Sequence, residues 1–271
     1  LTAWSTLPGS WSQPAAIPDA TNTVVFSISS LTTPQDVYLG GNQSALGLTF
    51  SSTSATTLRG GALGSPAVNT LTTGTGGISA AGVAGPVAFG TGTSDAVNIL
   101  LGGSQTWNVL NVGGLTVLGG VAGSATAGTS QTLSIAATGV TSGGPTTLFG
   151  VVADGTGGGI LNLAKSGRSP LWLANAANTY SGTTTITGGA VVISGNGSLG
   201  TGSSPVTISG LGSSLALAGG QTPFTLSRNL AMNALLESTG ANTVAGGISV
   251  TGGRITSAFD RLTLSGSLNL A

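Results

Sequence analysis

The chain contains no cysteine and no histidine. Without cysteine there are no disulfide bonds, so the stability of the fold must come from extensive regular packing. Without histidine, the commonest general base and the commonest metal ligand are both missing, and nucleophilic triads of the Ser-His type are impossible. Zinc and redox sites are excluded in practice, and we expect no bound cofactor or metal ion.

Charge is also scarce, because only 4% of the 271 residues are charged, against about 25% in an average soluble domain. The formal net charge is zero, and the six basic residues occur singly, as Arg59, Lys165, Arg168, Arg228, Arg254 and Arg261. Such scattered cations form no patch for nucleic acid or for an anionic membrane surface. A near-neutral surface has little colloidal repulsion, so we expect the protein to associate with itself or with a partner.

Long apolar runs are absent too, and no segment of about 18 apolar residues predicts a membrane span. The hydrophobic fraction is nevertheless 39%, which is too high for a disordered chain. The apolar residues alternate with small or polar ones in short segments bounded by glycine, which is the strand pattern. These segments include 46–50, 97–101, 107–112, 115–118, 160–163, 171–173, 183–187, 206–208 and 215–217. The most helix-like stretch, 226–237, reads equally well as strand, so the prediction is an all-β protein.

Many short strands separated by glycine turns fit a sandwich, a propeller or a β-solenoid. The 48 glycines suit the tight corners of a solenoid, where positive φ costs glycine nothing. Similar phrases return along the chain, as in 47–50, 114–117 and 261–264, with spacings compatible with coils of about 20–25 residues. We therefore predict a right-handed parallel β-helix of about ten to twelve coils with an N-terminal cap. Stacked at about 4.8 Å, twelve coils make a rod of about 55–60 Å.

The chain divides into residues 1–30, an N-terminal cap with the first strands, and residues 31–271, the β-helix repeat region. Trp4, Trp11 and Pro18 suit a cap, because large aromatic residues and proline blunt the exposed edge of a first coil. At the other end, 262–270 still reads as strand where the sequence stops. An open end of this kind favours end-to-end stacking of copies.

The most specific pattern lies in 163–192, and its strongest extent is 163–217. Its elements are Leu163-x-Lys165-x-Gly167, Leu171-x-Leu173, the phrase Asn178-Thr179-Tyr180-Ser181-Gly182-x-Thr184-x-Ile186, and Gly189-x-Val191. This pattern resembles the autotransporter-associated β-strand repeat of bacterial autotransporter passenger regions. The segment 168–170, Arg-Ser-Pro, departs from the small residues usual there and indicates an altered corner.

The resemblance implies a parallel β-helix that is secreted across a Gram-negative envelope and exposed at the bacterial cell surface. The N-terminus is similar to the start of a passenger region after signal-peptide removal. The family's C-terminal membrane barrel would lie beyond Ala271 in a longer precursor, or this protein uses the repeat alone.

Carbohydrate hydrolysis is the enzymatic reaction still open, and it needs two carboxylates about 5–9.5 Å apart. Of the six acidic residues, only Glu237 and Asp260 have a spacing that suits adjacent coils. The alternative is a surface ion pair between Glu237 and Arg261. A second candidate cluster, for a lyase-like reaction, combines Asp154, Lys165 and Arg168, although isolated charges are more often solvated corner residues.

Three further features of the sequence have partial likeness to binding sites. The segment 152–157 is rich in glycine but has one aspartate, so it predicts a turn and not a calcium site. Thr183, Thr185 and Thr187 form a short threonine row, which an ice-binding surface would have to repeat on successive coils. Trp107 and Trp172 lie inside strand patterns as core or corner residues, with a sugar-binding platform as the alternative.

The sequence thus predicts no catalytic, cofactor-binding or metal-binding residues. The expected function is that of a non-enzymatic extracellular adhesin or structural scaffold of a bacterial cell surface or matrix. Its partners would be itself or cell-surface and matrix components. The alternatives are a self-assembling subunit of an extracellular filament, sheath or layer, and a polysaccharide-active β-helix enzyme.

Overall fold

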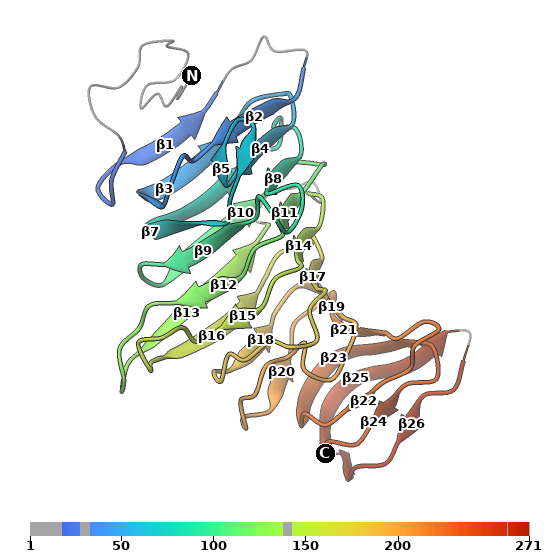
Figure 1. The fold of residues 1–271 in the computed structure, drawn as a ribbon. Helices are drawn as coiled ribbons and strands as arrows, with labels where there is room; N and C mark the ends of the chain where they lie inside the picture. The colour runs from blue at the N-terminus through green and yellow to red at the C-terminus, as the bar shows by residue number, and fades with distance from the viewer. Residues whose placement is uncertain (1–17, 28–32, 138–142, 259, 271) are drawn as a thin grey trace.

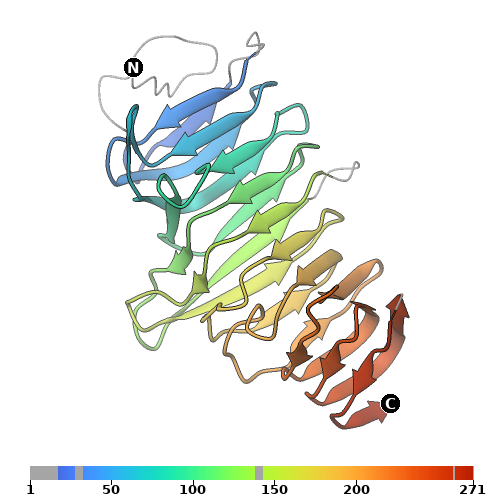
Figure 2. The ribbon, with the colours of Figure 1, turned by 45° about the vertical axis from the view of Figure 1, so that its right-hand side comes forward.

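The computed structural model describes residues 18–27, 33–137, 143–258 and 260–270. Throughout these residues the regular secondary structure is β, with no helix. It is dominated by one 22-stranded sheet whose strand pairs are all parallel, accompanied by a 3-stranded and a 2-stranded sheet. The strands lie side by side down the length of the molecule (Figures 1 and 2). The all-β prediction is confirmed, and the parallel stacking is consistent with a β-solenoid.

The strands stack in three ladders, each defined by parallel pairing from one turn of the chain to the next. The first ladder contains β1 (Thr23–Phe26), β3 (Gln43–Phe50), β7 (Asn69–Ala80), β10 (Gln105–Val109), β13 (Ser130–Ala136), β16 (Ile160–Lys165), β18 (Thr184–Ile186), β20 (Val206–Ile208), β23 (Leu230–Thr239), β25 (Ile248–Ala258) and β27 (Leu268–Leu270).

The second ladder contains β2 (Gln35–Tyr38), β4 (Thr56–Arg59), β8 (Val87–Phe89), β11 (Leu115–Val117), β14 (Thr146–Leu148), β17 (Leu171–Leu173), β19 (Gly189–Ile193), β21 (Ser213–Ala218) and the later halves of β23 and β25. The third ladder contains the first halves of β3 and β7, then β9 (Val97–Leu101), β12 (Val121–Gly123) and β15 (Val152–Ala153). Three later strands form the separate parallel sheet, β22 (Thr225–Leu226), β24 (Thr243–Val244) and β26 (Thr263–Leu264).

Side chains on each strand alternate between the interior and the surface, as the period-two pattern requires. Because the turns stack in register, the inward side chains form columns. One column of the first ladder runs through Val24, Leu48, Ile78, Trp107, Ile135, Lys165, Ile186, Ile208, Met232, Val250 and Leu270. Its members from Val24 to Met232 are at most 2% exposed. This stacking places β-branched and aliphatic residues directly on one another and forms a single continuous core.

The turns differ in length more than the repeated phrases predict. Along the same column the step from Leu48 to Ile78 spans 30 residues, whereas the step from Met232 to Val250 spans 18. The longer turns contain extra loops, such as the antiparallel hairpin of β5 (Gly61–Ala62) and β6 (Ser65–Pro66). A coil of 20–25 residues therefore describes only part of the chain.

Two local predictions concern the ends of the pattern. The stretch 226–237 contains the end of β22 and most of β23, so the strand interpretation is confirmed there. Most of the predicted cap, including Trp4 and Trp11, lies outside the described residues. Within that region β1 is described, and Phe26 stacks on Phe50 of the next turn with ring centroids 4.7 Å apart.

The close stacking of the turns should make the stability of the fold sensitive to substitution at some glycines and not at others. A Cβ at Gly182 would lie 2.2 Å from the carbonyl oxygen of Leu161 in the preceding turn, whereas at Gly82 the nearest atom would be 3.9 Å away. We expect Gly182→Ala to lower the free energy of unfolding by about 1–3 kcal/mol, because the two backbones must separate. The matched control Gly82→Ala should stay within about 0.5 kcal/mol of the parent. Urea unfolding measures both, and equal effects would contradict the described spacing.

Candidate functional site

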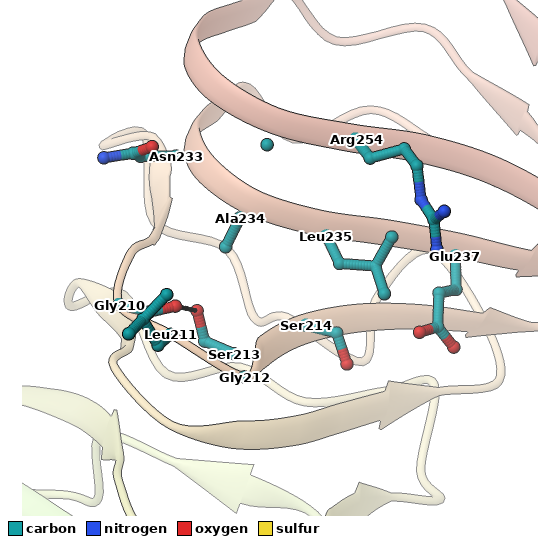
Figure 3. Close-up of a pocket in the computed structure, with 11 residues that line it drawn as sticks. Gly210, Leu211, Gly212, Ser213, Ser214, Asn233, Ala234, Leu235, Glu237 and Arg254 are labelled. Carbon is teal, nitrogen blue, oxygen red and sulfur yellow. Dashed lines mark hydrogen bonds between the residues drawn. The ribbon is translucent and has the colours of Figure 1, made fainter.

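A solvent-open pocket with a volume of about 530 Å³ lies on the outer side of β21, β23 and β25 (Figure 3). It is lined by Gly210, Leu211, Gly212, Ser213, Ser214, Asn233, Ala234, Leu235, Glu237, Gly253 and Arg254. The pocket thus collects a carboxylate, a guanidinium, an amide, two hydroxyls and two leucine side chains.

The pocket exists because neighbouring turns have different corners. Between β20 and β21 the chain makes a loop, and Leu211 in that loop is fully exposed. In the next two turns, β23 and β25 pass from the first ladder to the second without a break, and a register shift after Met232 takes up the bend. The loop therefore lies next to a corner at which the following two turns have no loop. At this bend Gly253 has φ of +93°, and a Cβ there would lie 1.9 Å from the carbonyl oxygen of Ala234, so only glycine fits.

Strand register decides which side chains meet in the pocket. Leu235 lies opposite Arg254, and Glu237 lies opposite Thr256. The expected ion pair between Glu237 and Arg261 is therefore wrong, because Arg261 follows the end of β25 and the side chain that shares the pocket with Glu237 is Arg254. Within the described ranges the ion pairs are both made by Arg59, so Glu237 and Arg254 are not bonded to each other.

The proposed hydrolytic pair, Glu237 and Asp260, does not share the pocket. Asp260 follows β25, is exposed, and does not line the pocket. Its carboxylate accepts a hydrogen bond from the backbone N–H of Arg261 (3.0 Å), and its carbonyl oxygen accepts one from the Ser257 hydroxyl. The pocket therefore has one carboxylate where general acid–base hydrolysis uses two.

The residues of the second predicted cluster, Asp154, Lys165 and Arg168, do not act together, and the first two make separate structural contacts. The Asp154 carboxylate accepts backbone hydrogen bonds from Leu161 (2.7 Å) and from Ser181 (3.0 and 3.1 Å), and so joins two turns. Lys165 is buried and Arg168 is exposed. Within the segment 152–157, Val152 and Ala153 form β15 and the predicted turn follows at 156–157. Among the described residues no group of three or more acidic, histidine or cysteine side chains is placed to hold a metal ion.

Lys165 occupies an inward position that isoleucine fills in the turns before and after it, at Ile135 and Ile186. It is 1% exposed, and its Nζ donates hydrogen bonds to the carbonyl oxygens of Ser166 (2.6 Å), Gly167 (2.9 Å) and Gly188 (3.0 Å). An ammonium has three N–H donors, so it satisfies all three carbonyls at this corner. Burial lowers the pKa of Lys165 to about 8.

The Asn-Thr-Tyr-Ser-Gly phrase forms another buried corner. The Asn178 side chain accepts a hydrogen bond from the Val152 N–H and donates one to the Ser198 carbonyl, both at 2.8 Å, and so bridges the turns on either side. Tyr180 is fully buried and its hydroxyl lies 2.8 Å from that of Thr184. Burial raises the pKa of Tyr180 to about 12. The Asn178 side chain therefore joins successive turns, whereas the Tyr180 hydroxyl is satisfied within its own turn.

A second buried cation was not predicted. Arg228 is 8% exposed and donates hydrogen bonds to the carbonyl oxygens of Leu199 (2.7 Å) and Ser204 (2.8 Å). Burial lowers its pKa. Like Lys165, it satisfies backbone carbonyls between turns, and its position in a Ser-Arg-Asn turn carries no sequence signal for that role.

The sequence also gave no sign of a three-residue charge network near the N-terminus. The Arg59 guanidinium binds Asp36 (2.8 Å) and Asp95 (2.6 Å), and it lies over the Tyr38 ring, 5.3 Å from the centroid. Asp36 and Asp95 are thus brought together, although the residue spacing had suggested that only Glu237 and Asp260 suit neighbouring turns.

Asp95 in this network is 2% exposed and accepts further hydrogen bonds from Thr91 and the Gly92 N–H. Burial alone would raise its pKa, but the hydrogen bonds from Thr91, Gly92 and Arg59 outweigh burial and hold the pKa well below its usual range. The hydrogen bonds to Asp36 and Asp95 raise the pKa of Arg59. A carboxylate held so firmly ionised fixes the loop after β8 and does not serve as a proton donor.

The structure also places the two tryptophans and the threonine row that the sequence singled out. Trp107 is fully buried, and its indole N–H donates to Gln105 (3.0 Å), so its core role is confirmed. Trp172 is 45% exposed on the outer side of β17. Thr185 stacks on Thr207 of the next turn but on Ala164 of the previous one, so the threonine row is not repeated on both sides.

Comparisons of the chain with known protein families, with curated proteins and with solved structures found no match. In the described ranges there is also no helix that is long and apolar enough to cross a membrane.

The buried Lys165 makes stability depend on pH. The folded chain releases this proton near pH 8, whereas the unfolded chain releases it near 10.5. Between these values the unfolded state binds more protons, so the free energy of unfolding should rise from about pH 8 to pH 9.5. Because the pKa of Tyr180 is raised in the folded chain, ionisation of this residue in the unfolded chain would lower the free energy of unfolding above pH 10, so the measurement stays below that pH. Urea unfolding across this range tests the rise, and it should flatten in Lys165→Met; an equal rise in that variant would contradict the assignment.

Removing Arg59 should destabilise the N-terminal turns. In Arg59→Met the nearly buried Asp95 loses its cation, and an unpaired buried carboxylate is unfavourable. We expect a thermal unfolding midpoint several degrees below that of the parent. The matched control is Arg168→Met, which removes an exposed arginine for which no ion pair is described and should leave the midpoint unchanged. Similar midpoints for the two variants would show that the network adds no stability.

Proposed function

We propose that this chain is a non-enzymatic extracellular β-helical protein of a bacterial cell surface or matrix, acting as an adhesin or structural scaffold of the autotransporter passenger type. The finer fold that we propose is a right-handed parallel β-helix of about ten to twelve coils. The observation that carries the proposal is the continuous parallel stack, in which each turn pairs with the next from β1 to β27.

The use of charge supports a mechanical role. Asp36, Arg59 and Asp95 bind one another, while Asp154 and Lys165 bind backbone groups of neighbouring turns. With Arg228 included, six of the twelve charged residues therefore make contacts that join turns of the stack. These contacts stabilise a chain that has no cysteine and hence no disulfide bonds, and a surface with few charged side chains has little colloidal repulsion and favours contact with other surfaces.

The residues that resemble the autotransporter repeat add support. Lys165 and Asn178 are buried at corners, where their side chains join turns by hydrogen bonds, and the buried Tyr180 hydroxyl pairs with Thr184 of its own turn. These are roles that a repeat motif of a stacked passenger would need. The resemblance is therefore compatible with the contacts in which these residues take part.

Surface display tests the proposed function. The chain would be displayed on a non-adherent bacterium through an unrelated membrane anchor, and cell aggregation and attachment to a matrix-coated surface would be measured. We expect both to rise above the level of cells that display the anchor alone, because the low-charge stack contacts neighbouring surfaces. Attachment equal to the anchor-only control would contradict an adhesive role.

Two further measurements separate the alternatives. Electron micrographs of the purified chain that show ordered fibres would favour the filament subunit. Release of reducing or unsaturated sugar from polysaccharides, abolished by Glu237→Gln, would favour an enzyme and overturn the proposal.

A further inference from the structure

The chain has twelve charged side chains, six basic and six acidic. Two of them lie close together on the surface and do not join turns of the stack. Glu237 and Arg254 both line the pocket beside β23, and neither makes an ion pair with a described residue. Figure 3 shows them on the same side of the pocket, with Asn233 at the opposite side. A carboxylate and a guanidinium left unpaired next to each other are available to bind a ligand.

The register of the second ladder extends this surface along the stack. Trp172 lies opposite Val192, which lies opposite Ala216, which in turn lies opposite Glu237. All four are on the outward side of their strands. Three strand steps of about 4.8 Å place Trp172 roughly 14 Å from Glu237 along the stack. We call this outward column, from Trp172 to Glu237, the outer strip.

Side-chain size changes along the outer strip. At one end is the Trp172 ring (45% exposed), and Phe149 (50% exposed) directly follows β14, the strand that pairs with β17 in the preceding turn. At the other end are the long side chains of the pocket. Between them lie Val192 and Ala216, and the neighbouring outward column contributes Ala190 and Ser214. Large groups at both ends of a low, small-residue surface suit an extended ligand that lies along the stack.

The chemistry of the two ends indicates what that ligand is. Exposed tryptophan offers an apolar face, and carboxylate, guanidinium and amide groups bind pairs of hydroxyls through several hydrogen bonds. Sugar rings present both an apolar face and hydroxyl edges. The pocket has one positive and one negative group, so it has no excess charge to attract a polyanion. Its ends are farther apart than one sugar ring is long.

We propose that the outer strip and the pocket together bind a neutral polysaccharide chain, with one sugar ring stacked on Trp172 and the hydroxyls of a later ring bound by Glu237 and Arg254. This inference rests on the proposed adhesive function and specifies its ligand as a linear, uncharged glycan.

Isothermal titration calorimetry of the whole chain with cellohexaose, chitohexaose and laminarihexaose tests the inference. We expect at least one hexasaccharide to bind, and its monosaccharide to bind far more weakly, because one ring cannot reach both ends. Trp172→Thr, Glu237→Gln and Arg254→Met should each weaken hexasaccharide binding by about tenfold or more. The matched control is Val112→Thr, which changes a side chain that is 80% exposed before β11, two turns before β17, and should leave affinity unchanged.

The circular dichroism spectrum and thermal midpoint of each variant would establish that it is folded. The inference is overturned if none of the hexasaccharides binds, if monosaccharides bind as tightly, or if folded variants of the outer strip bind as the parent does. Cell attachment distinguishes it from the proposed function. Attachment without saccharide binding overturns this inference alone, whereas saccharide binding without attachment supports it and contradicts the adhesive role.

Discussion

The whole structure depends on backbone hydrogen bonds between parallel strands in successive turns. Because each strand pairs with the equivalent strand of the next turn, every inward position lies on its counterpart, and the core becomes a set of columns such as that from Val24 to Met232. The same pairing brings backbones so close at the corners that a Cβ at Gly182 would meet the carbonyl oxygen of Leu161. The abundance of glycine and the shortage of large polar residues both follow from this spacing.

Strand pairing leaves corner carbonyls and amides without partners, and buried or half-buried polar side chains bind them. Lys165 and Arg228 donate to carbonyl oxygens of neighbouring turns, Asp154 accepts from backbone amides, and Asn178 does both. An unsatisfied backbone group inside the stack would cost about 1–3 kcal/mol, so one multidentate side chain at a corner replaces several such losses. This explains why a chain with so little charge buries part of it.

The sequence was sufficient for the strand pattern and the all-β class, because alternation is a local property that each short segment shows by itself. It was not sufficient for register. Loops such as the β5–β6 hairpin change the turn length, and Arg59 consequently meets Asp95 across 36 residues, a pair that no constant period predicts. In the same way, the register of β23 and β25 places Arg254, and not Arg261, beside Glu237. Glu237 could be selected from the sequence as the acid of interest, but its neighbours could not.

Variation in turn length is also what gives a uniform stack a distinctive surface. If every turn had the same corner, the backbone outline of the outside would repeat without interruption, and only the side chains would distinguish one turn from the next. The loop that carries Leu211 is followed by two turns without one, and the pocket forms at that change. Register then aligns the pocket with Trp172 on the same outward column, although 65 residues separate Trp172 from Glu237 in the sequence. A binding surface on such a fold therefore combines outward side chains of the regular strands with a pocket formed by irregularity between turns, because the strand backbone and the inward side chains are already used in stacking.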